Sequence, residues 1–328
     1  MATHPIVIVG TPEYNIAKRA HAIAGKSKEF VVSYAEWAAC LGSTMSTPGN
    51  ARCRCCNGPS AEQNLNATKA DEARANLRRR LARLGPTWNG QVFYVGHSQG
   101  AAHVYVGGYT KFEKNPNVNH CVTGGEYAEF LNMVLPKAPR GRLHLVIFAC
   151  WLGDATQESA RRFLGELLVG INLPGVTEAF AHATEFETWY SGADEESVTV
   201  NGVRRSGFDA FNDFGLAGLH AIAFMTDGLT EKPNEGGILK GKFDPRVDAS
   251  YRMTVEASKA GAKAARDAKF ATLEDILAKE YEGAGGRKNK VFTTFYWDGS
   301  AGALVRDASN ATAFGKAPPP ASVQRFAL

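Results

Sequence analysis

The sequence predicts an α/β fold in which a mostly parallel sheet of about six strands carries helices on both faces. Continuous runs of β-branched and aromatic residues, which are typical of buried parallel strands, recur along the chain. Segments with the apolar spacing of amphipathic helices alternate with these runs. The expected strands cover residues 5–10, 30–34, 92–96, 143–149, 176–183 and 290–297.

The helices are expected from apolar periodicity. The clearest covers residues 70–84, where Leu77, Leu81 and Leu84 recur at spacings of four and three. Residues 101–106 are instead rich in β-branched and aromatic side chains and are closed by two glycines, which favours a strand or hairpin. Further helices are expected at residues 15–26, 125–135, 159–168 and 255–282.

The chain has 328 residues, enough for one large α/β domain, and no clear linker divides it. We expect a single domain over residues 1–315, with a long loop at 41–68 and insertions at 184–285. Residues 316–328 include three consecutive prolines and are expected to form an extended or disordered Pro-rich tail.

The composition, with 44% hydrophobic residues and a net charge of +4, is that of a mildly basic globular protein. No apolar stretch has the length of a membrane span, and the start lacks the pattern of a signal peptide. We therefore expect a soluble protein that is cytoplasmic, or exported without a cleaved signal peptide. The arginines of residues 74–83 indicate a solvated helix face, so no nucleic-acid partner is expected.

Three of the six cysteines, Cys53, Cys55 and Cys56, are clustered in a Gly/Pro/Asn-rich segment. A zinc site would need a second pair of ligands at suitable spacing, and the sequence has none. The cluster is expected to hold reduced surface thiols, or a disulfide in an oxidising compartment. Neither a metal nor an organic cofactor is expected.

Two of the expected strands end on a reactive side chain. The strand at 92–96 leads directly into His97, and the strand at 143–149 leads into Cys150. In an open α/β sheet the chemistry lies just beyond the carboxyl ends of the strands. If the two strands are neighbours, an imidazole and a thiol lie side by side, which favours the nucleophilic thiolate.

His97 also lies inside Gly96–Gly100, which matches the G-x-S-x-G motif of α/β-hydrolases. On its own this motif would make Ser98 the nucleophile of an esterase or lipase, with Asp154 and either His182 or His220 completing the triad. The motif requires a strand-to-helix turn, whereas the residues that follow it favour a strand.

Several segments, taken in order, resemble those of caspase-like cysteine peptidases (clan CD), which include metacaspases and related bacterial caspase-fold proteins. The helix 73–84 and the strand 91–97 resemble the elements that lead to the family's catalytic histidine. Residues 123–131 and 145–153, the latter with the pattern Ala-Cys-x-x-Gly, resemble its next helix and its nucleophile strand. The 53 residues between His97 and Cys150 are close to the spacing of about 50 found in caspases. The resemblance covers residues 5–185.

This resemblance implies a thiol protease, a cysteine endopeptidase with a His97/Cys150 dyad that cleaves a protein or peptide substrate, with the chain itself as one candidate. It implies oxyanion donors among the backbone N–H groups of Cys150 and of Gly96 or Ser98. The alternatives to this function are a serine hydrolase and a catalytically inactive caspase-fold scaffold.

The sequence also departs from the family. Ser98 stands where many members have glycine, and Phe148 stands where caspases have Gln and metacaspases Asp in the primary specificity pocket. Phe148 either lines the pocket, favouring an apolar or small substrate residue, or faces the core. Trp189, Tyr190 and Asp194 follow the fifth expected strand, where such enzymes build substrate-binding loops.

Overall fold

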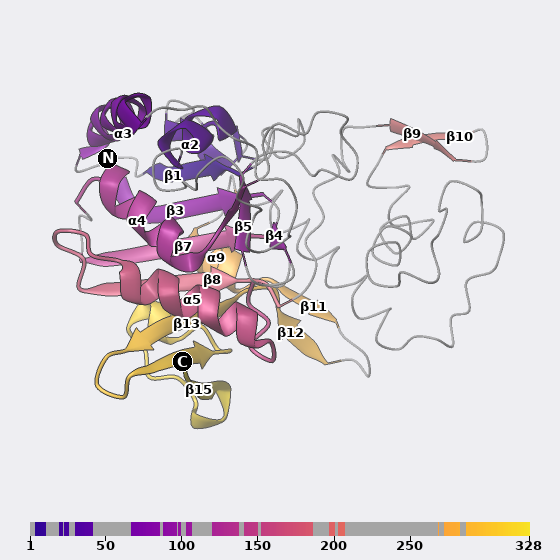
Figure 1. Ribbon diagram of the computed structural model, residues 1–328. Coiled ribbons are helices and arrows are strands. Elements are labelled where there is room, and N and C mark those ends of the chain that lie inside the picture. Colours follow the sequence, from indigo (N-terminus) through magenta and orange to yellow (C-terminus); the bar gives the residue numbers. More distant parts are fainter. Residues whose placement is uncertain are drawn as a thin grey trace.

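A computed structural model has an eight-stranded sheet at its centre, with the strand order β15-β14-β13-β8-β7-β3-β1-β2 (Figure 1). The structure describes residues 4–10, 20–21, 23–25, 30–41, 67–85, 88–96, 98–99, 103–106, 120–137, 141–149, 152–185, 197–200, 203–206, 268, 272–282 and 287–328.

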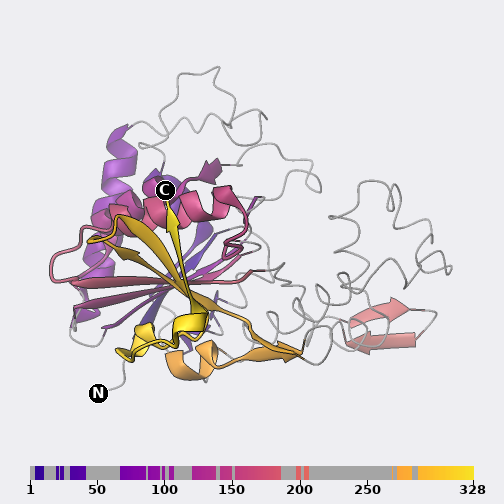
Figure 2. The same cartoon turned by 90° about the horizontal axis from the view of Figure 1, so that it is seen from below.

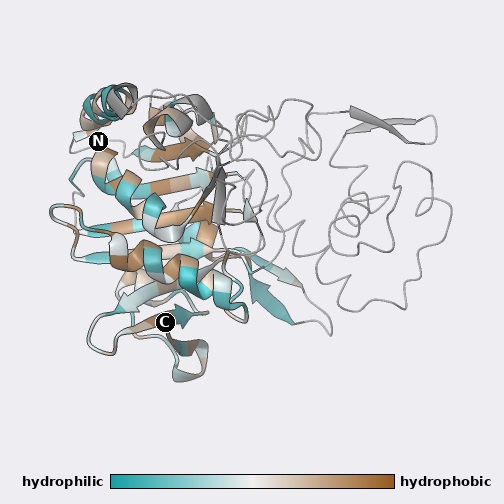
Figure 3. Cartoon of the chain, in the orientation of Figure 1, coloured by the Kyte–Doolittle hydropathy of each residue, from teal (hydrophilic) through white to brown (hydrophobic). Residues whose placement is uncertain are grey.

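Five neighbouring strands of this sheet run parallel. They are β2 (Val31–Val32), β1 (His4–Val9), β3 (Trp88–Val95), β7 (Arg142–Phe148) and β8 (Glu178–Ala183). Their middle parts are apolar on both faces, as Figure 3 shows by the brown colour of the sheet, because helices cover both sides. The predicted α/β class with a largely parallel sheet is thereby confirmed.

Three further strands extend the sheet in antiparallel fashion, so it has eight strands and not about six. They are β13 (Thr293–Asp298), β14 (Ala303–Asp307) and β15 (Val323–Ala327). The segment expected as a Pro-rich tail thus supplies the edge strand β15. Its residues are only half-buried or exposed, so they lack the continuous apolar pattern by which a central strand is recognised.

Helices cover both faces of the sheet, and alternate residues of β7 separate two cores. Leu145 and Ile147 face the side covered by α2 (Tyr34–Leu41), α3 (Ala67–Ala82), α4 (Gly124–Val134) and α5 (Glu158–Gly170). Val146 and Phe148 face the side covered by α9 (Leu273–Leu277). Figure 2 shows α5 above the sheet and α9 below it.

The end of the segment expected as a helix over 255–282 is a strand. Here β11 (Glu280–Glu282) pairs antiparallel with β12 (Lys288–Lys290), and β9 (Ser197–Val200) pairs in the same way with β10 (Val203–Ser206). Within the described part of the chain, no helix is long and apolar enough to cross a membrane.

The buried carboxylate of Asp307 ties the last residues to the sheet. It accepts hydrogen bonds from the backbone N–H groups of Ser309 and Thr312, both at 2.9 Å, where the short 3₁₀ helix η8 (Thr312–Phe314) begins. The Ser322 hydroxyl, at the end of the 3₁₀ helix η9 (Pro320–Ser322), donates to the carbonyl of Pro319 at 2.7 Å, and the Ser322 carbonyl accepts from the N–H of Ala308, the residue after Asp307, at 3.0 Å. These bonds fix the path of the chain into β15.

Candidate active site

Strands β3 and β7 lie side by side and end at the same level, at the carboxyl edge of the parallel strands (Figure 1). Their last paired residues are Val95 and Phe148. The N–H of Gly96 donates to the carbonyl of Phe148 at 3.2 Å, which continues the pairing by one residue. The expectation that these two strands are neighbours is confirmed.

The next residues in the chain carry the expected chemistry. His97 follows Gly96, and Cys150 follows Ala149. Both His97 and Cys150 lie outside the described residues. The structure defines the positions of the two strand ends that precede them in the chain.

A packed tyrosine explains the glycine that precedes His97. A Cβ atom at Gly96 would lie 2.6 Å from the hydroxyl oxygen of Tyr94, and one at Gly10 would lie 2.2 Å from it. Tyr94 is fully buried and packs edge-on against Trp37 and Tyr127, with ring centroids 6.4 and 5.9 Å away. Side chains are therefore excluded at the ends of both β1 and β3.

The chain after His97 forms an antiparallel sheet of short strands. It comprises β4 (Ser98–Gln99), β5 (His103–Val106) and β6 (His120–Val122), with Ser98 paired to Val104. The expectation of a strand or hairpin at residues 101–106 is confirmed over the described residues 103–106. Ser98 therefore lies in a strand and not at a strand-to-helix turn, which counts against the G-x-S-x-G motif as a nucleophile elbow.

His182, a candidate base for the alternative serine triad, lies in the interior. It is fully buried, and its ring nitrogens lie 3.1 Å from Nδ1 of His144 and 3.0 Å from the hydroxyl of Thr294. Burial also lowers its pKa well below the usual value. His182 is therefore unsuited to be the base of a serine triad, and the sequence carries no sign that residue 182 points into the core. His220 lies outside the described residues.

Phe148 faces the core, which is the second of the two orientations that the sequence leaves open. It is fully buried, with its ring 6.1 Å from that of Phe93 and 5.0 Å from that of Phe292. This burial counts against Phe148 as a residue that lines a specificity pocket, so the side chain of Phe148 indicates no substrate preference. The other pocket candidates, Trp189, Tyr190 and Asp194, lie outside the described residues.

One of the expected oxyanion donors is already engaged. Since the N–H of Gly96 donates to the Phe148 carbonyl within the sheet, it is not available to a developing oxyanion. The expectation for Gly96 was wrong because a glycine next to a strand end gives no sign of whether the pairing continues through it. Ser98, the alternative to Gly96, is paired with Val104 between β4 and β5, so Cys150 is the donor that the proposed mechanism uses.

The segments that follow β7 and β8 are joined by hydrogen bonds on both sides of residues 150–151. The hydroxyl of the buried Thr184 donates to the carbonyl of Ala149 at 2.8 Å, and the N–H of Gly153 donates to the carbonyl of Thr184 at 2.8 Å. A Cβ atom at Gly153 would lie 2.7 Å from the carbonyl oxygen of Ala183. The glycine of the Ala-Cys-x-x-Gly pattern thus permits this close approach.

Replacing Gly153 by alanine is expected to destabilise the protein by about 1 to 3 kcal/mol, because the added methyl group meets backbone atoms that cannot move aside. The measurement is urea denaturation of the purified variant. Gly125→Ala is the matched control, since a Cβ atom there meets nothing within 4 Å. Equal stability of Gly153→Ala and Gly125→Ala would contradict the close packing of Gly153.

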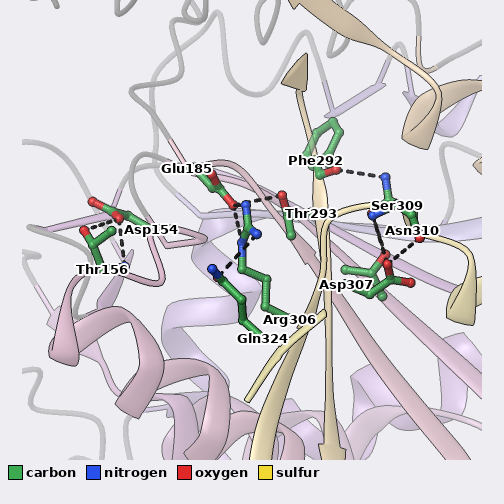
Figure 4. Close-up of polar contacts among 11 residues, drawn as sticks. Asp154, Thr156, Glu185, Phe292, Thr293, Arg306, Asp307, Ser309, Asn310 and Gln324 are labelled. Atoms are coloured by element: carbon green, nitrogen blue, oxygen red, sulfur yellow. Dashed lines mark hydrogen bonds and ion pairs between the residues drawn. The ribbon is translucent and has the colours of Figure 1, made fainter. Parts of the chain in front are cut away.

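A polar cluster continues the same edge of the sheet beyond β8 (Figure 4). Glu185 accepts hydrogen bonds from the guanidinium of Arg306, with Nε at 2.7 Å, and from the hydroxyl of Thr293 at 3.0 Å. It thereby fixes the point at which the chain leaves β8. Sequence reasoning missed Thr184 and Glu185, although both directly follow an expected strand, the same signal that selected His97 and Cys150.

Asp154, for which the sequence favours a structural role near the start of the next helix over a place in a serine triad, lies in the turn before α5. Its carboxylate accepts a hydrogen bond from the N–H of Thr156 at 3.1 Å (Figure 4). It also accepts one from the side-chain amide of Gln157 at 2.7 Å. These bonds shape the turn that leads into α5.

Cys40 is the cysteine whose side-chain surroundings the structure describes. Cys40 is buried, and burial, with a contribution from Glu36, raises its pKa to about 12, which makes it unreactive. In the described ranges, no three His, Cys, Asp or Glu side chains are arranged to hold a metal ion. The cluster of Cys53, Cys55 and Cys56 lies outside them.

The sequence matches no protein-family model, and no curated protein matches it significantly.

Proposed function

We propose that the chain is a cysteine endopeptidase in which Cys150 is the nucleophile and His97 is its acid–base partner. The observation that carries the proposal is the pairing of β3 with β7, in register up to Gly96 and Phe148. His97 and Cys150 each come two residues after a paired end, Val95 and Phe148. Equal distances from paired ends favour close approach of the two side chains.

In the proposed reaction His97 takes the proton of the Cys150 thiol, and the thiolate attacks the carbonyl carbon of a peptide bond. A carbon–sulfur bond forms, and the N–H of Cys150 stabilises the oxyanion. The carbon–nitrogen bond then breaks, and His97 returns its proton to the departing amine. Water hydrolyses the thioester, which releases the carboxylic acid and restores the thiol.

Two features favour this function over a serine hydrolase. Ser98 lies in β4, which pairs with β5, where an elbow serine would begin a helix. His182 is buried within the sheet and bonded on both ring nitrogens, so it cannot serve as the base of a serine triad. The third possibility is a scaffold without activity. The reactivity of the Cys150 thiol distinguishes it from a peptidase, because a scaffold needs no activated thiol.

Iodoacetamide is expected to label Cys150 at least about tenfold faster than the other cysteines at neutral pH, because an adjacent imidazole favours the thiolate. The measurement is mass spectrometry of peptides from protein labelled for increasing times, with buried Cys40 as the slow internal reference. His97→Ala should remove the advantage of Cys150. If Cys150 is labelled no faster than the other cysteines, the scaffold is the better description.

A further inference from the structure

Thr184 connects strand β8 to the segment that carries Cys150. Its hydroxyl donates to the carbonyl of Ala149, the residue before Cys150, and its own carbonyl accepts from the N–H of Gly153, three residues after Cys150. Both bonds measure 2.8 Å, and the Thr184 side chain is fully buried. Ala149 and Gly153, which lie on either side of residues 150–152, are therefore both bonded to the residue that follows the neighbouring strand β8.

Thr184 is itself held firmly. It follows Ala183, which pairs with Ile147 of β7 on one side and with Thr293 of β13 on the other. The next residue, Glu185, is bonded to Arg306 and to the Thr293 hydroxyl (Figure 4). Thr184 thus lies between two anchored residues, so a displacement of the Ala149–Gly153 segment would have to stretch bonds to a fixed point.

We propose that Thr184 is a positioning residue for the thiol of Cys150, acting through the Ala149 carbonyl and the Gly153 N–H. The inference rests on the proposed function, since it assigns a partner to the proposed nucleophile. A nucleophile that directly follows a strand end is fixed on one side only, by the strand. The bond from the Thr184 hydroxyl holds Ala149 on the strand side of Cys150, and the bond from the Gly153 N–H holds the chain on the other side.

Removal of the hydroxyl would leave the buried carbonyl of Ala149 without this donor, and the segment would shift to find another. A misplacement of about 1 Å at a reacting group costs about a hundredfold in rate. The loss should fall on kcat, because the proposed role concerns the geometry of attack and not the binding of substrate.

The test compares Thr184→Val, which keeps the shape and removes the hydroxyl, with Thr184→Ser, which keeps the hydroxyl. Thr177→Val is the matched control: the Thr177 hydroxyl donates to the Gly141 carbonyl at 3.0 Å and joins the same two strands at their opposite ends. The readouts are kcat and KM on a peptide substrate selected from a library, the pH profile of Cys150 alkylation, and thermal unfolding.

We expect Thr184→Val to lower kcat by about a hundredfold with little change in KM, and to slow alkylation of Cys150 at neutral pH. Thr184→Ser should restore most of the rate, and Thr177→Val should keep it. Thr184→Ala removes the same hydroxyl with less crowding and replaces Thr184→Val if that variant does not fold.

Wild-type kcat in both Thr184→Val and Thr184→Ala, or an equal loss in Thr177→Val, would overturn the inference. So would a loss that Thr184→Ser does not restore. If the wild type itself cleaves no peptide and Cys150 shows no His97-dependent reactivity, the proposed function fails instead, which keeps the two failures apart.

Discussion

Cys150→Ala is expected to abolish peptide cleavage, with a loss of at least about a thousandfold in kcat/KM, because no other side chain in the proposed mechanism can form the acyl intermediate. The measurement uses a peptide library for detection and the best peptide found for kinetics. Ser98→Ala, which changes the residue next to His97, is the matched control and should retain most of the activity.

Hydrolysis of a simple ester, assayed in parallel, distinguishes Cys150 from Ser98 as the nucleophile. A serine hydrolase would lose ester turnover in Ser98→Ala and keep it in Cys150→Ala, which is the reverse of our expectation. That outcome would contradict the proposed dyad and would restore Ser98 as the nucleophile in spite of its place in β4. The structural reason for our expectation is the pairing of Ser98 with Val104, which replaces the helix that an elbow requires.

The second large effect is loss of stability in acid, caused by a buried pair of histidines. Nδ1 of His144 lies 3.1 Å from Nε2 of His182, and Nδ1 of His182 lies 3.0 Å from the hydroxyl of Thr294. This hydroxyl donates to Oδ1 of Asn310, whose amide donates to the carbonyls of Leu277 and Phe292. The Thr294 oxygen therefore accepts a hydrogen bond from Nδ1–H of His182, and Nε2 of His182 accepts a hydrogen bond from Nδ1–H of His144.

This arrangement holds both rings in the neutral form. Burial, with a contribution from Arg142, lowers the pKa of His144 to about 4, and burial, with a contribution from His144, lowers the pKa of His182 well below its usual value. Below about pH 6.5 the unfolded chain therefore binds protons that the folded chain does not. The contribution of the two neutral histidines to the free energy of unfolding is therefore fully present above about pH 6.5 and is lost as the pH falls towards 4.

For His144 alone the shift corresponds to about 3 kcal/mol in the free energy of unfolding. The measurement is urea denaturation at pH 7.5 and at pH 4.5. His144→Gln, which cannot titrate, should reduce the difference in stability between the two pH values by about 2 to 3 kcal/mol. The exposed His21 provides the control variant His21→Gln, which should leave the difference unchanged. An equal effect of both variants would contradict the role of the buried pair.

Much of the fold could be predicted because strands buried on both faces have a distinctive sequence. The run from Leu143 to Phe148 is apolar except for His144, and its termination before Cys150 identified one end of the candidate site. The hairpin after Gly100 could also be predicted, from its β-branched and aromatic residues. The edge strand β15 could not, because an edge strand with exposed side chains lacks that pattern.

The sequence by itself determined which residues follow the ends of the central strands, since periodicity and composition specify where a buried strand stops. Only the tertiary structure decided that β3 and β7 are neighbours and that Gly96 continues their pairing. It also decided that Phe148 faces the core and that Thr184 lies between Ala149 and Gly153. The order of the strands, the direction in which a side chain points and the hydrogen bonds between distant segments all depend on how the whole core packs. The local sequence around each residue does not specify that packing.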